Sequence, residues 1–173
     1  HDSSFVTHHS SLITRHYIMT KAPRTFYLLH GDDDYSLEQE VAVLRARMGD
    51  ELNTSDFDGE SASVPEVLNA VCSYPFLADK RLVIVKGMLA HITRKGAGET
   101  GKKAAELLAD ALPTLPEWAR LVFVERQLLA DSNRFVKLAK ELPNAYEKAF
   151  TTPNDATGWI FRQAQEVYGV DIQ

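Results

Sequence analysis

Cysteine is almost absent from this 173-residue chain, which contains only Cys72. A single cysteine cannot form a disulfide within the chain, so the sequence indicates a reducing, cytoplasmic location. Cys72 falls on the apolar side of a predicted helix, and we expect a small core residue there, not a nucleophile. Long apolar runs are missing too. None approaches the roughly 18 residues that a membrane-spanning helix needs, so no membrane contact is predicted.

Patterns typical of metal sites and catalytic sites are also missing. Four of the six histidines lie in the first sixteen residues, without a cysteine or a cluster of carboxylates beside them. We interpret residues 1–24 as an N-terminal extension, disordered or left by cloning. Asp56, Asp58 and Glu60 are expected to be ordinary solvated acids. No Ser-His-Asp or Cys-His pairing has a supporting motif, so we predict no catalytic residue, no metal and no cofactor.

The composition is that of a globular protein with a substantial core. Apolar residues make up 45% of the chain and charged residues 25%. The net charge of -5 argues against a protein that simply coats nucleic acid, although it does not exclude a local basic patch.

Short apolar runs alternate with amphipathic segments about five times. The runs at 26–30, 82–85 and 121–124 are apolar throughout, which is typical of strands covered on both faces, and weaker strands are predicted at 52–57 and 146–150. Helices are predicted to begin at Ser36 and Ser63 and to span 103–112, 131–142 and 155–168. This order predicts a three-layer α/β domain over 25–152, with a mostly parallel five-stranded sheet.

Turn and capping residues set the expected element boundaries. Ser36 with Gln39, and Ser63 with Glu66, have the spacing of capping boxes. Pro75 is expected to end the second helix. A polar, glycine-containing stretch from 93 to 101 is expected to be a mobile loop.

A three-layer domain of this kind invites a search for a phosphate-binding loop after the first strand. That junction reads His30-Gly31-Asp32-Asp33-Asp34-Tyr35-Ser36, with one glycine, no lysine and three consecutive aspartates. A P-loop needs backbone N–H groups and a lysine around the phosphates. Three carboxylates there would repel a triphosphate, so the domain is predicted to lack a functional P-loop.

A second segment, Gly96–Lys103, matches the pattern G-x-x-x-x-G-K. Lys103 stands where the magnesium-binding hydroxyl belongs, and the preceding strand ends about ten residues too early. We therefore interpret the segment as a solvated basic loop. Glu125, at the end of the strand at 121–124, is interpreted as a surface or ion-paired residue.

Three segments resemble the delta subunit of the bacterial DNA polymerase III clamp loader, in its amino-terminal AAA+-like domain. They are Tyr27–Asp33 leading into Ser36–Gln39, then Ser73–Val85, then Leu121–Glu125. The second segment, with its Pro-Phe-Leu, small and acidic residues, two basic residues and an apolar strand, is the most specific. The region from Trp159 to Ile172 is similar to the start of that family's lid-like second domain, so 153–173 is expected to be the first helix of a truncated second domain.

The resemblance implies a clamp-binding site. In the family, two adjacent apolar residues after the second helix enter a pocket on the sliding clamp, and these correspond to Phe76 and Leu77, with Pro75 and Tyr74 beside them. Large apolar side chains in a connection this short need a partner surface, either a clamp or the local core. Lys80 and Arg81 are expected as rim contacts or as solvated charges.

The resemblance also implies a role and partners. The chain would bind and open the sliding clamp (the beta subunit) in DNA replication, without being an ATPase or an enzyme itself, although the holoenzyme is a DNA-directed DNA polymerase. It would meet the other clamp-loader subunits, and primer–template DNA only within the complex. Two alternatives stay open: a nucleotide-binding enzyme using Gly96–Lys103, and a DNA-binding module. The module would use six basic residues: Lys80, Arg81, Arg94, Lys95, Lys102 and Lys103.

Overall fold

A computed structural model describes residues 22–152 of the chain. These residues form a single five-stranded sheet in which every pair of neighbouring strands is parallel. The strands are β1 (Phe26–Gly31), β2 (Thr54–Asp58), β3 (Arg81–Lys86), β4 (Ala119–Glu125) and β5 (Ala145–Phe150). Their order across the sheet is β2-β3-β4-β1-β5. The predicted α/β class and the five strands are confirmed, and the sheet is wholly parallel where a mostly parallel one was expected.

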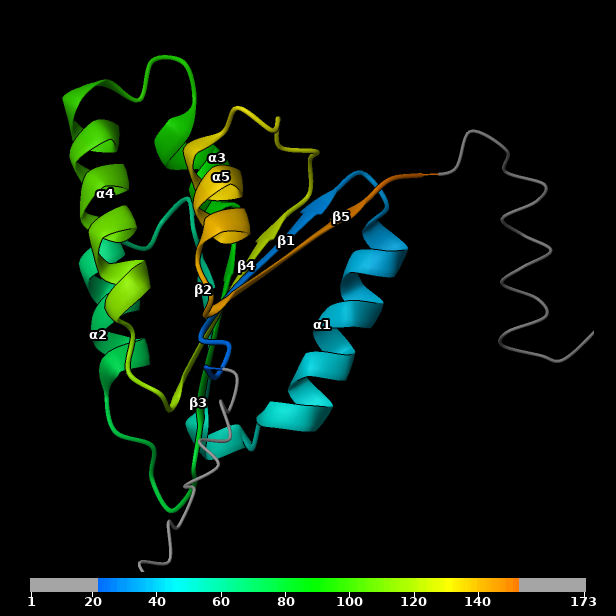
Figure 1. Cartoon of the computed structure of the whole chain (residues 1–173), viewed down its shortest axis with the longest axis vertical. Helices are drawn as coiled ribbons and strands as arrows, with labels where there is room; N and C mark the ends of the chain where they lie inside the picture. Colours follow the sequence, from blue (N-terminus) through cyan, green and yellow to red (C-terminus); the bar gives the residue numbers. More distant parts are fainter. Residues whose placement is uncertain (1–21, 153–173) are drawn as a thin grey trace, which may run out of the picture.

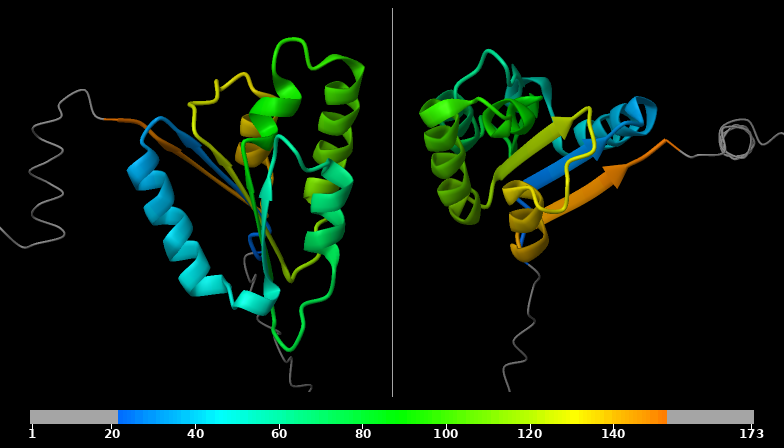
Figure 2. Two further views of the ribbon diagram at one scale, coloured as in Figure 1. Left: turned by 180° about the vertical axis from the view of Figure 1, so that it is seen from behind. Right: turned by 90° about the horizontal axis from the view of Figure 1, so that it is seen from above.

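Five helices cover the two faces of the sheet in the described range (Figures 1 and 2). They are α1 (Asp34–Met48), α2 (Val64–Cys72), α3 (Met88–Thr93), α4 (Gly98–Ala111) and α5 (Arg134–Glu141), with short 3-10 turns at η1 (Glu51–Asn53) and η2 (Leu112–Thr114). Helix α1 lies alone on one face, and α2, α3, α4 and α5 pack on the other. The result is the three-layer arrangement predicted from the sequence.

Side chains that alternate along the strands produce two cores. Phe26 and Leu28 of β1 face the four-helix side, whereas Tyr27 and Leu29 face α1. Every residue of β1 and β4 is buried, because both strands have a neighbour on each side and helices on both faces. This burial explains why the two strands read as continuous apolar runs.

The second helix begins as predicted and the first does not. Ser63 and Glu66 form the reciprocal hydrogen bonds of a capping box at α2. At α1 the N-cap is Asp33, whose carboxylate accepts a hydrogen bond from the Ser36 backbone N–H, so Ser36 lies inside the first turn. A carboxylate is favoured at this end of a helix, and the aspartate takes precedence over the serine.

The prediction of a loop at 93–101 is wrong over most of that range. Helix α3 occupies 88–93, and α4 begins at Gly98 instead of Lys103, so the connection between the helices is short. Gly87 precedes α3 with φ 78°, a left-handed conformation that glycine adopts without strain.

Two smaller predictions are also corrected. Cys72 is exposed at the last turn of α2 and does not belong to the core. Helix α5 begins after Asn133, whose side chain caps it, and not at 131. The predicted N-terminal extension and the helix at 155–168 lie outside the described residues. Within the described range, no helix has both the length and the apolar character needed to cross a membrane.

Candidate functional site

The junction between β1 and α1, where a phosphate-binding loop would lie, is closed by the chain itself. The N–H groups of Asp32 and Asp33 both donate to the Phe150 carbonyl, at 3.0 and 3.3 Å. The Asp33 carboxylate accepts from the Ser36 N–H at 3.0 Å. Three backbone donors of the junction are therefore already bonded to the protein, and a carboxylate occupies the N-terminus of α1.

Two basic side chains at this end of the sheet, Lys86 and Arg126, are bonded to an acidic residue of the domain. Glu38 of α1 accepts hydrogen bonds from Arg126 at 2.7 Å and from Lys86 at 3.2 Å. The bond from Arg126 is the main reason that the pKa of Glu38 lies below its usual range. Lys86 and Arg126 thus form ion pairs within the domain instead of presenting free charge to a phosphate.

Glu125 is buried, which corrects the expectation of a surface or ion-paired residue. Its carboxylate accepts hydrogen bonds from the N–H groups of Leu89 at 2.7 Å and Ala90 at 3.2 Å. Burial raises its pKa to about 7, and the two backbone hydrogen bonds oppose that rise. The side chain therefore holds the first turn of α3 against the end of β4.

The G-x-x-x-x-G-K segment does not form a phosphate loop. Gly101, Lys102 and Lys103 lie inside α4, and the Gly101 N–H donates to the Ala97 carbonyl at 3.1 Å. The segment follows α3, whereas a P-loop follows a strand. A groove of about 550 Å³ beside it, between α2, α3 and α4, is lined mainly by small and apolar residues and contains no carboxylate to hold magnesium.

The connection from α2 to β3 projects large apolar side chains into solvent. Tyr74 is 78% exposed, Phe76 63% and Leu77 90%, while Pro75 is half-buried. Leu77 has φ 52°, the left-handed conformation that leucine rarely adopts. The pair at Phe76 and Leu77 does not fold back to close the local core, so its apolar surface is available to a partner.

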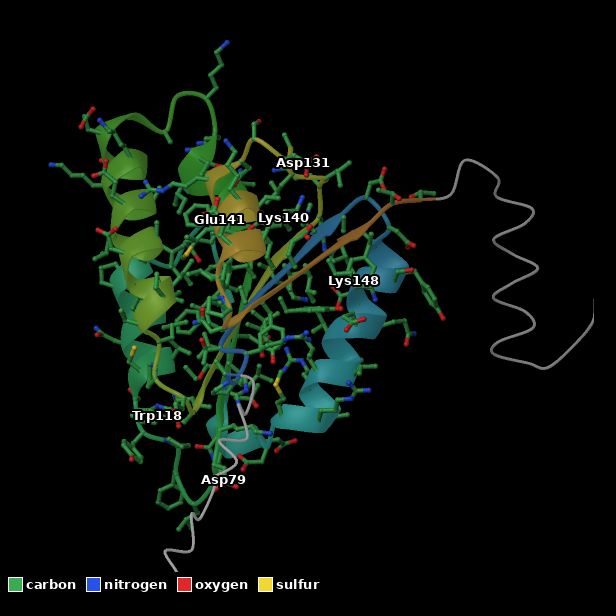
Figure 3. All side chains as sticks on the ribbon, in the orientation of Figure 1. Asp79, Trp118, Asp131, Lys140, Glu141 and Lys148 are labelled. Carbon is green, nitrogen blue, oxygen red and sulfur yellow. The ribbon has the colours of Figure 1, made fainter. Side chains whose placement is uncertain are left out.

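The exposed side chains of Tyr74, Phe76 and Leu77 form an apolar patch, and an aromatic contact extends it. The ring of Tyr74 lies 4.4 Å from that of Trp118, centroid to centroid, and a shallow hollow of about 390 Å³ lies beside both rings. Figure 3 shows Trp118 and Asp79 at the same end of the molecule, far from Asp131 at the opposite end. The patch therefore lies at the amino ends of the strands, and the closed phosphate position lies at their carboxyl ends.

The two expected rim residues differ in their surroundings. The Arg81 guanidinium donates to the Ala70 carbonyl near the end of α2 and to the Ser55 hydroxyl at 3.5 Å, so it braces the fold on the inner side of the connection. Lys80 makes no hydrogen bond or ion pair with any residue of 22–152. The Arg81 side chain is therefore engaged within the domain, whereas residues 22–152 leave the Lys80 ammonium unpaired.

Two residues near the patch were not identified from the sequence. Asn53 is almost fully buried, and its side-chain amide bonds both backbone groups of Phe76. Trp118 contacts Tyr74 from a loop more than forty residues away. An asparagine at the end of a short 3-10 turn and a tryptophan in a loop give no local signal, because their roles depend on strand neighbours that only the sheet order reveals.

Fold and site together define an AAA+-like α/β domain whose phosphate position is closed and whose exposed apolar loop lies at the other end of the sheet. The family model described as DNA polymerase III, delta subunit matches residues 27–149, and the chain belongs to that family. A search of the curated proteins gave no match.

A solved structure with a similar fold is the Bacillus subtilis DNA clamp loader delta protein. Its TM-score is 0.68 at 21% sequence identity, over 83% of this chain. The match spans only 44% of that protein, so the present chain is similar to less than half of its length. At this identity the likeness bears on the fold alone.

Proposed function

We propose that this chain binds and opens the sliding clamp as the delta subunit of a bacterial clamp loader, and that it hydrolyses no ATP itself. The observation that carries the proposal is the exposure of Phe76 and Leu77 at the tip of the α2–β3 connection. Family membership supports the same proposal, because the resemblance of Ser73–Val85 to the family implies a clamp contact at this pair.

The energetics suit a contact of this kind. Two adjacent large apolar side chains that become fully desolvated in a pocket typically contribute about 2 kcal/mol or more each. Lys80 can add an electrostatic contact at the rim, which affects the association rate more than the affinity. Tyr74 and Pro75 enlarge the apolar surface around the pair.

The absence of ATPase activity is supported by the β1–α1 junction. Its N–H groups are bonded to the Phe150 carbonyl, and the Asp33 carboxylate occupies the helix N-terminus. A nucleotide would have to break these bonds and displace the Asp33 carboxylate, which is negatively charged like its phosphates. Control by ATP would then come from other clamp-loader subunits, and primer–template DNA would be met only within the assembled complex.

The mechanism follows from differential affinity. A ligand shifts an equilibrium only by the difference between its affinities for the two states. If the loop binds a clamp protomer more tightly when the adjacent clamp interface is open or strained, binding shifts the clamp toward opening without any covalent chemistry.

The deciding experiment measures binding of the chain to the sliding clamp of the same organism, by calorimetry or surface plasmon resonance. The Phe76→Ala/Leu77→Ala double variant is compared with wild type after circular dichroism has shown that both are folded. Binding by wild type that is lost in the folded variant supports the proposal. A folded wild-type chain that does not bind the clamp would remove it, and titrations with nucleotide and with DNA would then test the two alternatives.

A further inference from the structure

We propose that Asn53 is a positioning residue that holds the connection between α2 and β3, residues 73–80, in the conformation that binds the clamp. We call this connection the clamp-binding loop, and the inference rests on the proposed function. Asn53 is the last residue of η1, immediately before the edge strand β2. The loop that it contacts begins 20 residues later in the chain and leads into β3, the strand paired with β2.

The contact is specific and involves the backbone of the loop. The Phe76 N–H donates to Asn53 Oδ1 at 2.6 Å, and Asn53 Nδ2 donates to the Phe76 carbonyl at 2.8 Å. One side-chain amide therefore pairs with both backbone groups of one residue, as a neighbouring strand would. The side chain of Phe76 takes no part and stays free for a partner.

Asp50 fixes the orientation of this amide. Its carboxylate accepts from Asn53 Nδ2 at 3.0 and 3.1 Å and from the Asn53 N–H at 2.9 Å. A carboxylate only accepts hydrogen bonds, so Nδ2 must face it and Oδ1 must face the Phe76 N–H. With Asn53 only 1% exposed, water does not compete for these bonds.

The anchor lies next to a strained residue. Leu77 follows Phe76 directly and has φ 52°, which is unfavourable for a residue with a Cβ. Without the two bonds at Phe76, the loop would relax to conformations in which the pair points elsewhere. A binding conformation that is populated only one-tenth of the time weakens the apparent affinity about tenfold.

A matched control exists at the other edge of the sheet. Asn144 immediately precedes β5, and its Nδ2 donates to the Leu112 carbonyl at 3.2 Å and to the Thr25 hydroxyl at 2.7 Å. Asn53 and Asn144 both use the side-chain amide for hydrogen bonds at the same end of the fold, Asn53 buried and Asn144 half-buried, but only Asn53 bonds the loop.

The test compares Asn53→Ala with Asn144→Ala by two measurements on the 173-residue chain. The first is hydrogen exchange of the Phe76 amide by NMR, and the second is the Kd for the sliding clamp. We expect Asn53→Ala to expose the Phe76 amide and to weaken clamp binding about tenfold. Asn144→Ala should change neither the exchange of the Phe76 amide nor the Kd for the clamp, even if it lowers the global stability as much as Asn53→Ala does. Asp50→Ala keeps Asn53 but removes the carboxylate that orients its amide. This variant should also expose the Phe76 amide and weaken clamp binding, each by less than Asn53→Ala does.

A double-mutant cycle separates positioning from general destabilisation. Added to Phe76→Ala/Leu77→Ala, the Asn53→Ala change should weaken any residual clamp binding no further. Unchanged protection of the Phe76 amide in Asn53→Ala, or equal effects of the two asparagine changes on clamp binding, would overturn the proposal. If wild type fails to bind the clamp, the proposed function falls, while the exchange measurement still decides whether Asn53 holds the loop.

Discussion

The carboxylate of Glu125 accepts a hydrogen bond of 2.7 Å from the backbone N–H of Leu89, which ties the end of β4 to the first turn of α3. The carboxylate is buried, and burial raises its pKa to about 7 from an ordinary 4.5. In the folded state it therefore holds its proton to a higher pH than in the unfolded state. Its contribution to stability is full below about pH 4.5 and is lost as the pH rises through about 7.

Replacing Glu125 by Gln should remove this pH dependence. Since one pKa unit corresponds to about 1.4 kcal/mol, the wild type should lose on the order of 3 kcal/mol relative to Glu125→Gln between pH 5 and pH 8. Urea unfolding of both proteins at these two pH values measures the difference. Stabilities that change in parallel with pH would contradict the assignment.

Gly31 should tolerate no side chain. Its φ is 148°, and a Cβ there would lie 1.7 Å from the Phe150 carbonyl oxygen, a backbone atom that cannot move aside. Gly31→Ala should lower the free energy of unfolding by about 3 kcal/mol or more. Gly96→Ala is the control, because Gly96 also has a positive φ, 94°, but has open space around it. Equal losses in the two variants, measured by denaturant unfolding, would contradict the steric argument.

Asp33→Ala should cost about 1 kcal/mol of stability without creating a nucleotide site. The aspartate is the N-cap of α1, and caps of this kind contribute about that much. The Phe150 carbonyl still occupies the N–H groups of the junction in the variant. Calorimetric titration with Mg·ATP should show no binding for wild type or variant, and nucleotide binding by either would contradict the closed-junction argument.

Alanine at Phe76 or at Leu77 should weaken clamp binding by about 2 kcal/mol each and leave the stability within about 0.5 kcal/mol of wild type, because both side chains are exposed. Leu128→Ala is the matched control, as Leu128 is another exposed apolar residue, 54% exposed, that follows β4 at the other end of the fold. A loss of stability at either loop position would show that the pair supports the core instead.

Trp118→Phe should be nearly neutral or slightly stabilising, which is unusual for a large aromatic residue. The indole N–H is buried and has no hydrogen-bond partner among the residues that the structure describes. Removing an unsatisfied donor recovers its desolvation cost, whereas the ring contact with Tyr74 is kept. A loss of more than about 2 kcal/mol in thermal or urea unfolding would show that the N–H has a partner.

Local patterns predicted those parts of the fold that local interactions determine. The apolar runs of β1 and β4 report burial on both faces, and Ser63 with Glu66 forms its capping box within one turn. The three aspartates after β1 predicted an unfavourable charge for a phosphate, and the structure places the Asp33 carboxylate at the N-terminus of α1. The exposed pair at Phe76 and Leu77 was predicted from the resemblance, and its role at the clamp stays a prediction.

The features that the sequence did not reveal depend on contacts between distant segments. Helix α3 was missed because its first turn is bonded by Glu125, 36 residues away from Leu89. Asn53 bonds Phe76 across 23 residues, which depends on β2 lying beside β3. The exposure of Cys72 likewise depends on which face of α2 packs on the sheet near its last turn.

The strand order has a consequence for the growing polypeptide on the ribosome. β1 is made first, yet it pairs only with β4 and β5, the last two strands of the described range. Until β4 has been synthesised, β1 has no partner strand, while β2 and β3 can already pair. Non-local pairing of this kind slows folding and leaves apolar surface exposed to chaperones or to aggregation. A chain that ends before β5 would also leave His30 without Glu147, which accepts its Nε2–H at 2.8 Å.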